Sequence, residues 1–350
     1  MGLTGAVPAP EQRLGTAHLP GGGRVAYAVT GSGPFLLVAP GWLSHLELGW
    51  AIPVERRFHE ALASGRTLVR YDRPGCGLSD PYDGPRDLAL ELATIGAVTE
   101  AVGMTRFDLL GWSLGAAVAA QWAADRPETV DRLVLYGGWA EGAAIGDEDS
   151  RRHILGLLAT HWGLGSDLLT DVFAPDADAG TRAAIARYQR AASSAETAVA
   201  LLRLAYALDV RTTLPRIQTP TLVLARRGDR AAPLAQSRVL ADAIPSAELV
   251  ELDGRSHLPA IGDAESVVAQ IRGFLGLPTL RRGVPTGLTP RQAEVAALVA
   301  DGLTNREIAQ RLGITERSAE SHVERIRLRL GFRSRSQVAA WHVATHPEVR

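Results

Sequence analysis

Residues 106–124, Arg106-Phe-Asp-Leu-Leu-Gly-Trp-Ser-Leu-Gly-Ala-Ala-Val-Ala-Ala-Gln-Trp-Ala-Ala124, decide the fold of this chain. Phe107–Leu110 is a short apolar run of strand character, and Leu114–Ala124 is small and apolar enough for a buried helix. Between them, Gly111 and Gly115 flank Ser113. A serine on a sharp strand-to-helix turn has a strained backbone and close neighbours, which glycines at those positions accommodate. The sequence therefore predicts a Ser113 hydroxyl that stands clear at the edge of a sheet, and a following helix whose N-terminal N–H groups point at the group that the serine attacks.

Apolar runs and helical segments alternate on both sides of this stretch. Strands are expected at 14–19, 24–29, 35–39, 67–71, 132–136, 220–225 and 248–252, and helices at 54–64, about 86–103 and 263–275. Such alternation predicts an α/β fold with a mostly parallel sheet covered by helices on both faces. Residues 140–215 contain only helical segments, at 150–160, 181–192 and 195–208. We expect this part to be a helical lid inserted between two strands.

A nucleophilic serine requires a base within hydrogen-bond reach, and the base requires a carboxylate that fixes its tautomer. In this kind of sheet the acid and then the histidine follow the serine along the chain. His257 stands in the loop directly after the last predicted strand, whereas His153 and His161 lie in the helical insertion. We therefore predict His257 as the base.

The acid is expected at the end of the strand before the last one. Asp229 stands there and is the predicted acid. Glu141, which follows the strand at 132–136, is the alternative acid. Asp253 is closer to His257 in sequence, but its loop position is typical of a residue that forms a turn.

With these residues in place, residues 1–277 resemble the α/β-hydrolase family. The stretch Arg70-Tyr-Asp-Arg-Pro-Gly-Cys-Gly-Leu-Ser-Asp80 resembles bacterial members that are fused to signalling domains. The resemblance implies a serine hydrolase for ester-type bonds, with an oxyanion hole formed by the backbone N–H groups of Trp42 and Leu114, each worth about 3 kcal/mol of barrier. Where the family often carries His-Gly, this chain has Pro40-Gly41, which leaves the Trp42 N–H available while the shape of the hole stays open.

Residues 288–350 predict a second, all-α domain, joined by a linker at 278–287. Four helices are expected, the first with Thr289 as N-cap and Pro290 in its first turn, and the others at 304–312, 316–330 and about 336–344. The second and third are joined by the three-residue turn Gly313-Ile314-Thr315. Two short helices joined in this way are typical of a helix-turn-helix.

The second domain resembles the LuxR-type helix-turn-helix domain over nearly its entire length. Leu288–Val295, Gly302–Ala309 and Arg333–Arg335 carry the resemblance, which implies binding to double-stranded DNA. On the helix that begins at Glu316, we expect Ala319, Val323 and Ile326 to face inward. The residues left to face DNA are Arg317, Ser318, Ser321, His322 and Arg325, together with Thr304, Asn305 and Arg306 at the start of the preceding helix. The early ones suit base edges and the later ones phosphates, and a solvated ion pair is the alternative for any single arginine.

Composition limits the remaining possibilities. Cys76 is the only cysteine, so neither a disulfide framework nor a thiolate metal cluster is expected, and no metal or cofactor is implied. Residues 1–10 lack a signal-peptide pattern, and no apolar run approaches the roughly 20 residues that span a bilayer. We expect a cytoplasmic protein that does not contact a membrane.

Charge distribution bears on how the second domain binds. Residues 286–350 hold ten arginines and seven acidic residues, a net of +3, against −1 for the whole chain. Because +3 is modest, one copy is expected to bind DNA weakly, and a homodimer on DNA is predicted. A domain that binds another protein in place of DNA is the alternative.

The sequence as a whole predicts a transcription regulator whose first domain binds a small apolar ester or lactone. Whether this domain also hydrolyses its ligand stays open. One alternative is a working serine hydrolase with an accessory DNA-binding tail, and another is a catalytically silent ligand sensor.

Overall fold

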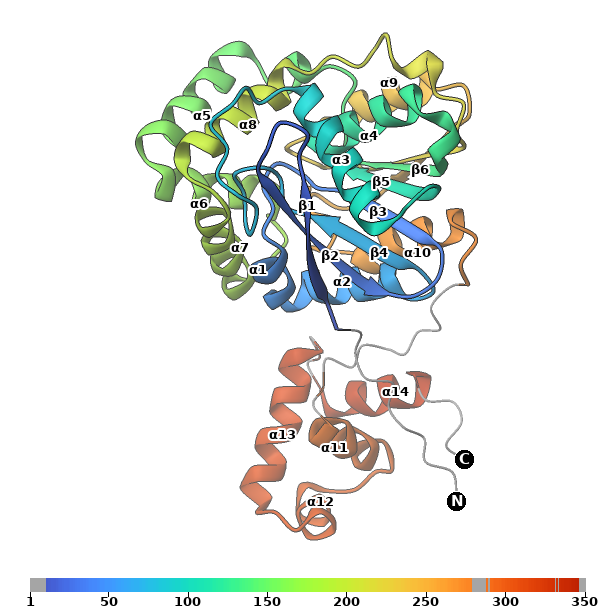
Figure 1. Cartoon of the computed structure of the whole chain (residues 1–350). Coiled ribbons are helices and arrows are strands. Elements are labelled where there is room, and N and C mark those ends of the chain that lie inside the picture. Colours follow the sequence, from blue (N-terminus) through green and yellow to red (C-terminus); the bar gives the residue numbers. More distant parts are fainter. Residues whose placement is uncertain (1–10, 279–287, 289, 331, 333, 346–350) are drawn as a thin grey trace. The chain divides into compact units, whose positions relative to one another are not determined.

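The computed structural model describes residues 11–278, 288, 290–330, 332 and 334–345. Its contacts divide the chain into two compact units, residues 1–279 and 280–350, and each is described by itself (Figure 1). No helix in the described part of the chain has the length and apolar character needed to cross a membrane.

An eight-stranded sheet forms the centre of the first unit, with the strand order β1-β2-β4-β3-β5-β6-β7-β8. Its strands are β1 Arg13–His18, β2 Arg24–Gly31, β3 Phe35–Ala39, β4 Thr67–Tyr71, β5 Phe107–Trp112, β6 Val130–Tyr136, β7 Thr221–Arg226 and β8 Ala247–Leu252. β2 is antiparallel to both β1 and β4, and every other neighbouring pair is parallel. The predicted mostly parallel sheet is confirmed.

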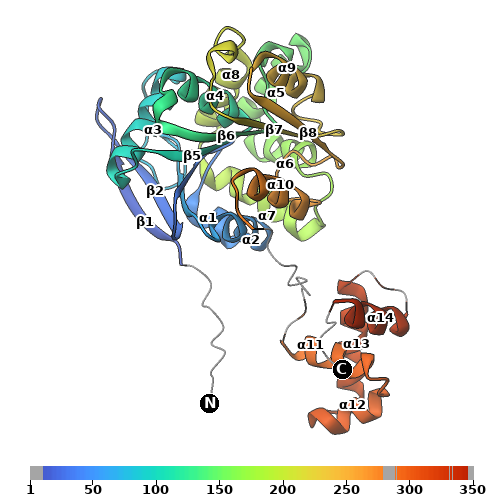
Figure 2. The ribbon, with the colours of Figure 1, turned by 90° about the vertical axis from the view of Figure 1, so that its right-hand side faces the viewer.

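The central strands are apolar on both faces because each face is covered by helices. Leu37 and Leu109 belong to one buried cluster and their neighbours Leu36 and Leu110 to another, as expected for side chains that alternate along a strand. The first cluster includes residues of α3 Leu88–Val102, α4 Leu114–Asp125 and α9 Leu234–Ala243, and the second includes residues of α2 Pro53–Ala63 and α10 Ala264–Phe274. Figure 2 shows α3 and α4 on one side of the sheet and α2 and α10 on the other.

Four helices are inserted between β6 and β7: α5 Glu148–Thr160, α6 Trp162–Phe173, α7 Ala179–Ala192 and α8 Ala195–Ala207. We call them the lid. The sequence analysis did not predict α6, whose first turns contain Gly163 and Gly165, residues that lower helix propensity. It also did not predict α9 or the short helix α1, Leu46–Ala51.

The second unit contains α11 Pro290–Ala300, α12 Asn305–Leu312, α13 Glu316–Arg329 and α14 Arg335–Thr345. Thr304 and Glu307 form a capping box that begins α12, and Gly313, with φ of 63°, ends it. The three residues predicted to face inward are buried: Ala319, Val323 and Ile326. Thr289, the predicted N-cap of the first helix, lies outside the described residues.

Candidate functional site

Ser113 occupies the turn between β5 and α4. Its φ of 53° is the only positive φ of a residue other than glycine in the described part of the chain. A Cβ on Gly111 would lie 2.4 Å from the carbonyl oxygen of Gly115, and one on Gly115 would lie 2.2 Å from that of Ala39. Glycine is therefore required at both positions, because any side chain there would force the helix away from the sheet. The strained serine backbone costs about 1–3 kcal/mol and is held by a 2.9 Å hydrogen bond from its N–H to the carbonyl of Tyr136.

His257 and Asp229 lie at the carboxyl ends of β8 and β7, and their side chains meet. Nδ1 of His257 is 2.8 Å from Oδ2 of Asp229. The other carboxylate oxygen of Asp229 accepts hydrogen bonds from the backbone N–H groups of Ala231 and Ala232. Both side chains are buried, at 5% and 2% exposure, so the bond is protected from water. This arrangement fixes Nδ1 as the protonated ring nitrogen and leaves Nε2 as the basic one.

The other residues weighed in the sequence analysis lie elsewhere. Glu141 is not at the end of β6, which stops at Tyr136, and its carboxylate forms an ion pair with Arg211 at 3.0 Å. Asp253 has a 94% exposed side chain paired with Arg227. His153 and His161 belong to the lid. Of the candidates for the acid, Asp229 is the one in contact with His257.

The backbone N–H groups of Trp42 and Leu114, both near the serine, form no hydrogen bond with the described residues. Trp42 follows the end of β3, and Leu114 is the first residue of α4. The buried guanidinium of Arg73 donates from Nη2 to the carbonyl of Pro40 at 2.6 Å and from Nε to that of Gly41 at 2.9 Å. It also forms a buried ion pair with Glu91. Arg73 thus holds two carbonyls of the turn that presents the Trp42 N–H, a role that the sequence analysis did not assign.

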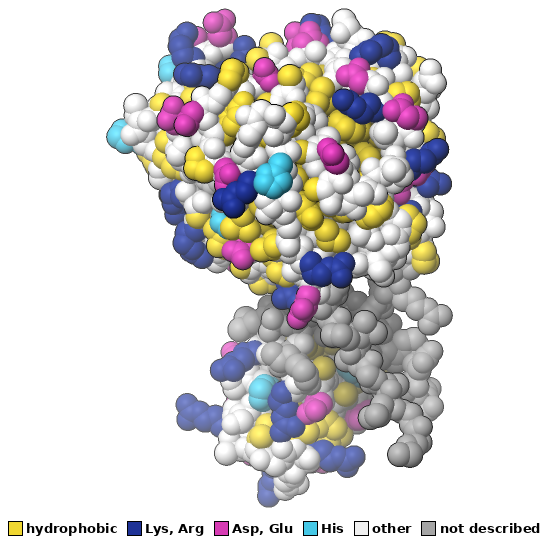
Figure 3. Space-filling model, viewed as in Figure 1, with side chains coloured by type: hydrophobic (Ala, Val, Ile, Leu, Met, Phe, Trp, Pro, Cys, Tyr) yellow, Lys and Arg dark blue, Asp and Glu magenta, His cyan; other side chains and the backbone are white. Residues whose placement is uncertain are grey.

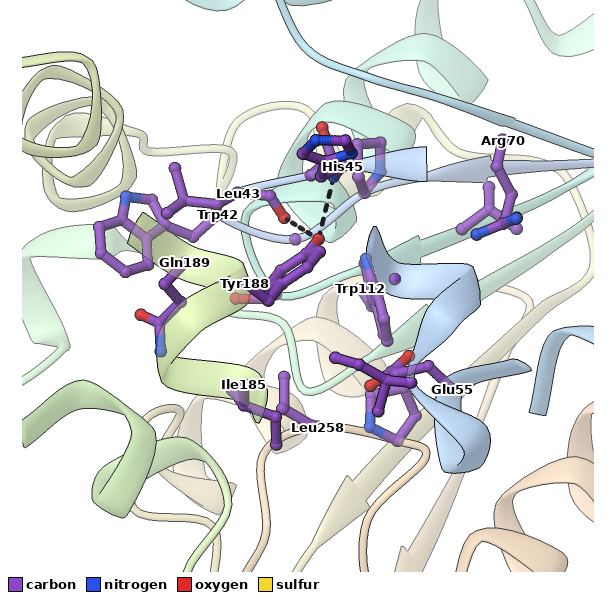
Figure 4. Close-up of a pocket in the computed structure, with 18 of the residues that line it drawn as sticks. Trp42, Leu43, His45, Glu55, Arg70, Trp112, Ile185, Tyr188, Gln189 and Leu258 are labelled. Atoms are coloured by element: carbon purple, nitrogen blue, oxygen red, sulfur yellow. Dashed lines mark hydrogen bonds between the residues drawn. The ribbon is translucent and has the colours of Figure 1, made fainter. Parts of the chain in front are cut away.

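A cavity of about 1000 Å³, counting its open mouth, lies beside Ser113 and His257. Figure 4 shows Trp42, Leu43 and Gln189 on one side of the view and Arg70 on the other, with Tyr188 and Trp112 between them. The lid contributes Phe173, Ile185, Tyr188 and Gln189 to its wall. The Tyr188 hydroxyl accepts from the His45 N–H and donates to the Leu43 carbonyl, which ties the lid to the loop after β3.

One part of the cavity wall is polar and was not predicted. Glu55 and His59 come from α2 and Arg70 from β4, and each is less than 10% exposed. Burial raises the pKa of the Glu55 carboxyl to about 7, although the nearby charge of Arg70 opposes the shift. Burial and Arg70 together lower the pKa of His59 well below its ordinary value, so its imidazole is neutral. Burial lowers the pKa of Arg70 to about 10, which leaves it charged at neutral pH. The sequence gives no periodic signal for this set because its members become neighbours only when α2 packs on the sheet.

The lid is bonded to the loop that carries His257. The carbonyl of Phe173, at the end of α6, accepts from the N–H of His257 at 2.8 Å and from that of Leu258 at 3.2 Å. Asp176, which follows α6, accepts hydrogen bonds from Arg255 and from the Ser256 hydroxyl. These contacts position the loop of the candidate base against the lid.

In the second unit, the residues predicted to face DNA differ in their exposure and in whether their side chains already have hydrogen-bond partners. Arg306, Arg317 and Arg325 are exposed, and arginines stand out from this unit in Figure 3. The Thr304 hydroxyl is used in the capping box, and the Asn305 side-chain oxygen accepts from Arg335. Ser318 contacts Thr315, and Ser321 and His322 are half-buried. The exposed arginines are therefore the best placed for DNA.

Within the described residues, no group of three or more His, Cys, Asp or Glu side chains is arranged to hold a metal ion.

Comparison with known proteins identifies both units. Residues 34–264 match the model of the α/β-hydrolase fold family, and residues 286–342 match that of the bacterial regulatory proteins of the luxR family. A pyrrolizixenacetamide deacetylase from Xenorhabdus hominickii is 28% identical over 73% of this chain and 96% of its own length. A pimeloyl-[acyl-carrier protein] methyl ester esterase from Xanthomonas campestris pv. campestris is 29% identical over 71% of this chain and 97% of its own length.

Solved structures agree on the fold of the first unit. A bromoperoxidase from Bacillus anthracis superposes with a TM-score of 0.67 at 19% identity, over 75% of this chain and all of its own. The resemblances of the two domains to the α/β-hydrolase and LuxR-type families are confirmed. This chain belongs to the α/β-hydrolase fold family and joins an esterase-like hydrolase domain to a C-terminal LuxR-type DNA-binding domain.

Proposed function

We propose that this protein is a transcription regulator whose hydrolase domain binds a small ester-type ligand and hydrolyses it at Ser113. The observation that carries the proposal is the buried hydrogen bond between His257 and Asp229, beside a cavity that Ser113 also lines. Because a fold by itself does not establish an activity, this geometry matters more than the family membership.

The proposed reaction follows from the positions of the side chains. Ser113 Oγ attacks the ligand's acyl carbon while Nε2 of His257 takes the hydroxyl proton. The imidazolium that results is stabilised by the Asp229 carboxylate, with which Nδ1 already forms a 2.8 Å bond. His257 then gives the proton to the departing alcohol, and an acyl-enzyme remains. A water molecule, deprotonated by the same nitrogen, releases the acid and restores Ser113.

The negative charge that develops on the carbonyl oxygen requires donors that are already in place. The backbone N–H groups of Trp42 and Leu114 make no other hydrogen bond with the described residues, which supports their assignment as the oxyanion hole. Loss of one such donor costs about 3 kcal/mol of barrier height. Arg73 supports the hole indirectly, since it holds the carbonyls of Pro40 and Gly41.

The ligand class follows from the cavity and from the relatives. The walls are largely apolar, with Trp42, Leu43, Ile185 and Leu258 on them. The named relatives include a deacetylase and a methyl ester esterase, both of which cleave acyl bonds. A small, mostly apolar ester or lactone is the ligand that fits both.

The second domain is proposed to bind operator DNA as a homodimer in the cytoplasm. α13 is the recognition helix, with Arg317 near its start reading a base edge and Arg325 two turns later contacting a phosphate. A modest net charge of +3 over residues 286–350 supports two copies acting together.

A sensor that binds its ligand without turnover is the second candidate. The observation that favours it is that the Ser113 hydroxyl forms no hydrogen bond with His257 in the described part of the chain. Apo active sites often tighten only when substrate binds, so hydrolysis stays the first choice.

A fluorophosphonate probe separates the two candidates. The full-length chain is expected to be labelled on Ser113 and to hydrolyse a p-nitrophenyl ester, and Ser113→Ala is expected to lose both. Mass spectrometry of the tryptic peptides locates the adduct. Labelling of another serine, or labelling that persists in Ser113→Ala, contradicts the proposal, and an unlabelled protein that still binds esters favours the sensor.

A further inference from the structure

Five arginines among the described residues of the first unit are buried, and four of them are held either by an ion pair or by several hydrogen bonds to backbone carbonyls. Arg66 and Arg73 form ion pairs with Asp108 and Glu91. Arg226 donates four hydrogen bonds to backbone carbonyls, and Arg272 donates three. This is the usual arrangement, because an unpaired charge taken out of water is costly.

Arg70 is the exception within the described part of the chain. It is 7% exposed, yet its one hydrogen bond goes from Nη2 to the neutral side chain of Gln12. Its guanidinium also lies over the Trp50 ring, 5.1 Å from the centroid. Its Nε is buried without a hydrogen-bond partner, as are those of Arg226 and Arg272, but Arg70 has neither the several carbonyl partners of those two residues nor, among the described residues, an ion pair with a carboxylate. The charge of Arg70 is therefore only partly compensated by the protein.

The nearest acidic groups do not take this role. Asp72 acts on Arg70 only at a distance, and its Oδ2 accepts the backbone N–H groups of Leu46 and Leu78. Glu55 also acts at a distance, and burial holds much of its population in the neutral, protonated form near pH 7. Both acidic groups line the cavity along with Arg70, so the Arg70 side chain borders the ligand's space.

A second unpartnered donor lies nearer the candidate nucleophile. The indole N–H of Trp112 is buried without a hydrogen-bond partner, and its nitrogen lies 3.5 Å from where a Cβ on Gly41 would be. Trp112 adjoins Ser113 in the chain and lies beside Glu55 in Figure 4, whereas Arg70 enters from the edge of the view. The cavity thus offers hydrogen-bond donors at some distance from the apolar wall formed by Trp42 and Ile185.

We propose that the ligand carries a carboxylate at the end remote from its ester bond, and that Arg70 binds this carboxylate inside the cavity. The inference rests on the proposed function for the ester end and adds the chemistry of the other end. A carboxylate supplies the anion that Arg70 lacks, and charge-assisted hydrogen bonds of this kind are roughly twice as strong as neutral ones. The ligand class is then the half-ester of a dicarboxylic acid, or the lactone of a hydroxy-dicarboxylic acid, whose second carboxylate stays free.

Binding measured without turnover tests the proposal directly. Full-length Ser113→Ala is titrated in a calorimeter with monomethyl adipate, which carries one carboxylate, and with dimethyl adipate, which carries none. The monomethyl esters of succinate and suberate vary the distance between the two ends. We expect at least one carboxylate-bearing ester to bind at least about tenfold more tightly than its dimethyl counterpart, a difference of about 1.4 kcal/mol in binding free energy.

Variants of Arg70 show whether this residue is the source of the preference. In the Ser113→Ala background, Arg70→Gln is expected to abolish it and Arg70→Lys to retain part of it. Arg56→Gln is the matched control, because Arg56 lies over the same Trp50 ring, 5.4 Å from its centroid, but does not line the cavity. That variant is expected to keep the preference, and a melting curve for each variant identifies any that fails to fold.

The outcomes distinguish this inference from the proposed function. Equal binding of charged and uncharged esters, or a preference that survives in Arg70→Gln, overturns the inference even if the esters are hydrolysed. A carboxylamide analogue that binds as tightly as the carboxylate also overturns it, since charge would then not matter. If wild type binds the carboxylate selectively but hydrolyses neither mono-p-nitrophenyl adipate nor p-nitrophenyl hexanoate, the inference stands and the hydrolase proposal falls.

Discussion

Glu55→Gln is expected to make the protein more stable in alkaline solution, and the pKa of Glu55 gives the size of the effect. This carboxyl is buried in the cavity wall, and burial raises its pKa from 4.5 to about 7. The charged and titratable groups that face it are Arg70 from β4, His59 from its own helix and Tyr188 from α7. Arg70 favours the ionised form, but burial is the larger effect.

The sign follows from linkage between protonation and folding. A carboxyl whose pKa is higher in the folded protein binds its proton more tightly there, so its contribution to stability is complete below the unfolded pKa of 4.5. This contribution to the free energy of unfolding falls as the pH rises from 4.5 to the folded pKa of about 7, and above that pKa it changes no further. A shift of about 2.5 pH units at about 1.4 kcal/mol per unit corresponds to about 3 kcal/mol between the two limits.

Urea unfolding followed by tryptophan fluorescence measures this difference. Six of the seven tryptophans lie in residues 1–279, so the signal reports mainly on the first unit. At about pH 8 the Gln variant is expected to exceed wild type by up to about 3 kcal/mol, and the advantage should shrink to below about 1 kcal/mol near pH 5. Glu60→Gln removes a partly exposed carboxylate of α2 that pairs with Arg56, and it should change stability by less than about 1 kcal/mol at either pH. A pH-independent difference between wild type and Glu55→Gln would refute the reasoning.

Two further predictions concern the second domain and its connection to the first. Arg317→Ala should reduce the discrimination between operator and random DNA, whereas Arg325→Ala should weaken binding to both DNAs about equally and flatten the salt slope by about one unit. Fluorescence anisotropy at several salt concentrations measures both effects. An identical pattern for the two variants contradicts these roles. If occupancy of the cavity controls DNA binding, operator DNA must change ligand affinity by the same factor as the ligand changes DNA affinity, which calorimetry on Ser113→Ala can measure. A variant that binds ligand normally but no longer alters DNA affinity would show that the acyl-enzyme or the product is the signal.

The centre of the sheet was predictable from sequence because its inner strands are buried on both faces. Phe35–Ala39 is a continuous apolar run, and Thr67–Tyr71 is mostly apolar, with Arg70 as its one charged residue. Asp229 and His257 were predictable because each follows a strand end in a fixed chain order. Their catalytic roles stay predictions until Ser113 is tested.

The polar part of the cavity was not predictable for a physical reason. Arg70 stands in a strand with apolar neighbours, and nothing in that run shows that its charge will lack a partner. The missing ion-pair partner becomes evident only in the folded structure, where Gln12, Trp50 and α2 pack around Arg70. The same applies to Arg73, whose bonds to the carbonyls of Pro40 and Gly41 join segments about thirty residues apart. Helix α6 was missed because Gly163 and Gly165 weaken its local signal, while packing of Leu169 into the core compensates.

The hydrogen bonds that the Phe173 carbonyl accepts from the loop after β8 couple the position of the lid to the placement of the proposed base. The carbonyl at the end of α6 receives the N–H of His257 itself, so the backbone of the proposed base is anchored on the lid as well as on the sheet. Any ligand that stabilises the closed lid therefore also stabilises the position of the imidazole, and a ligand too large for closure is held beside a less ordered base. Ligand size is then expected to determine how firmly the proposed base is held. The rate of amide hydrogen exchange at His257 measures this effect. Exchange is expected to be slower with a small ester bound than with a bulky one, and equal rates would show that the lid does not affect the position of the base.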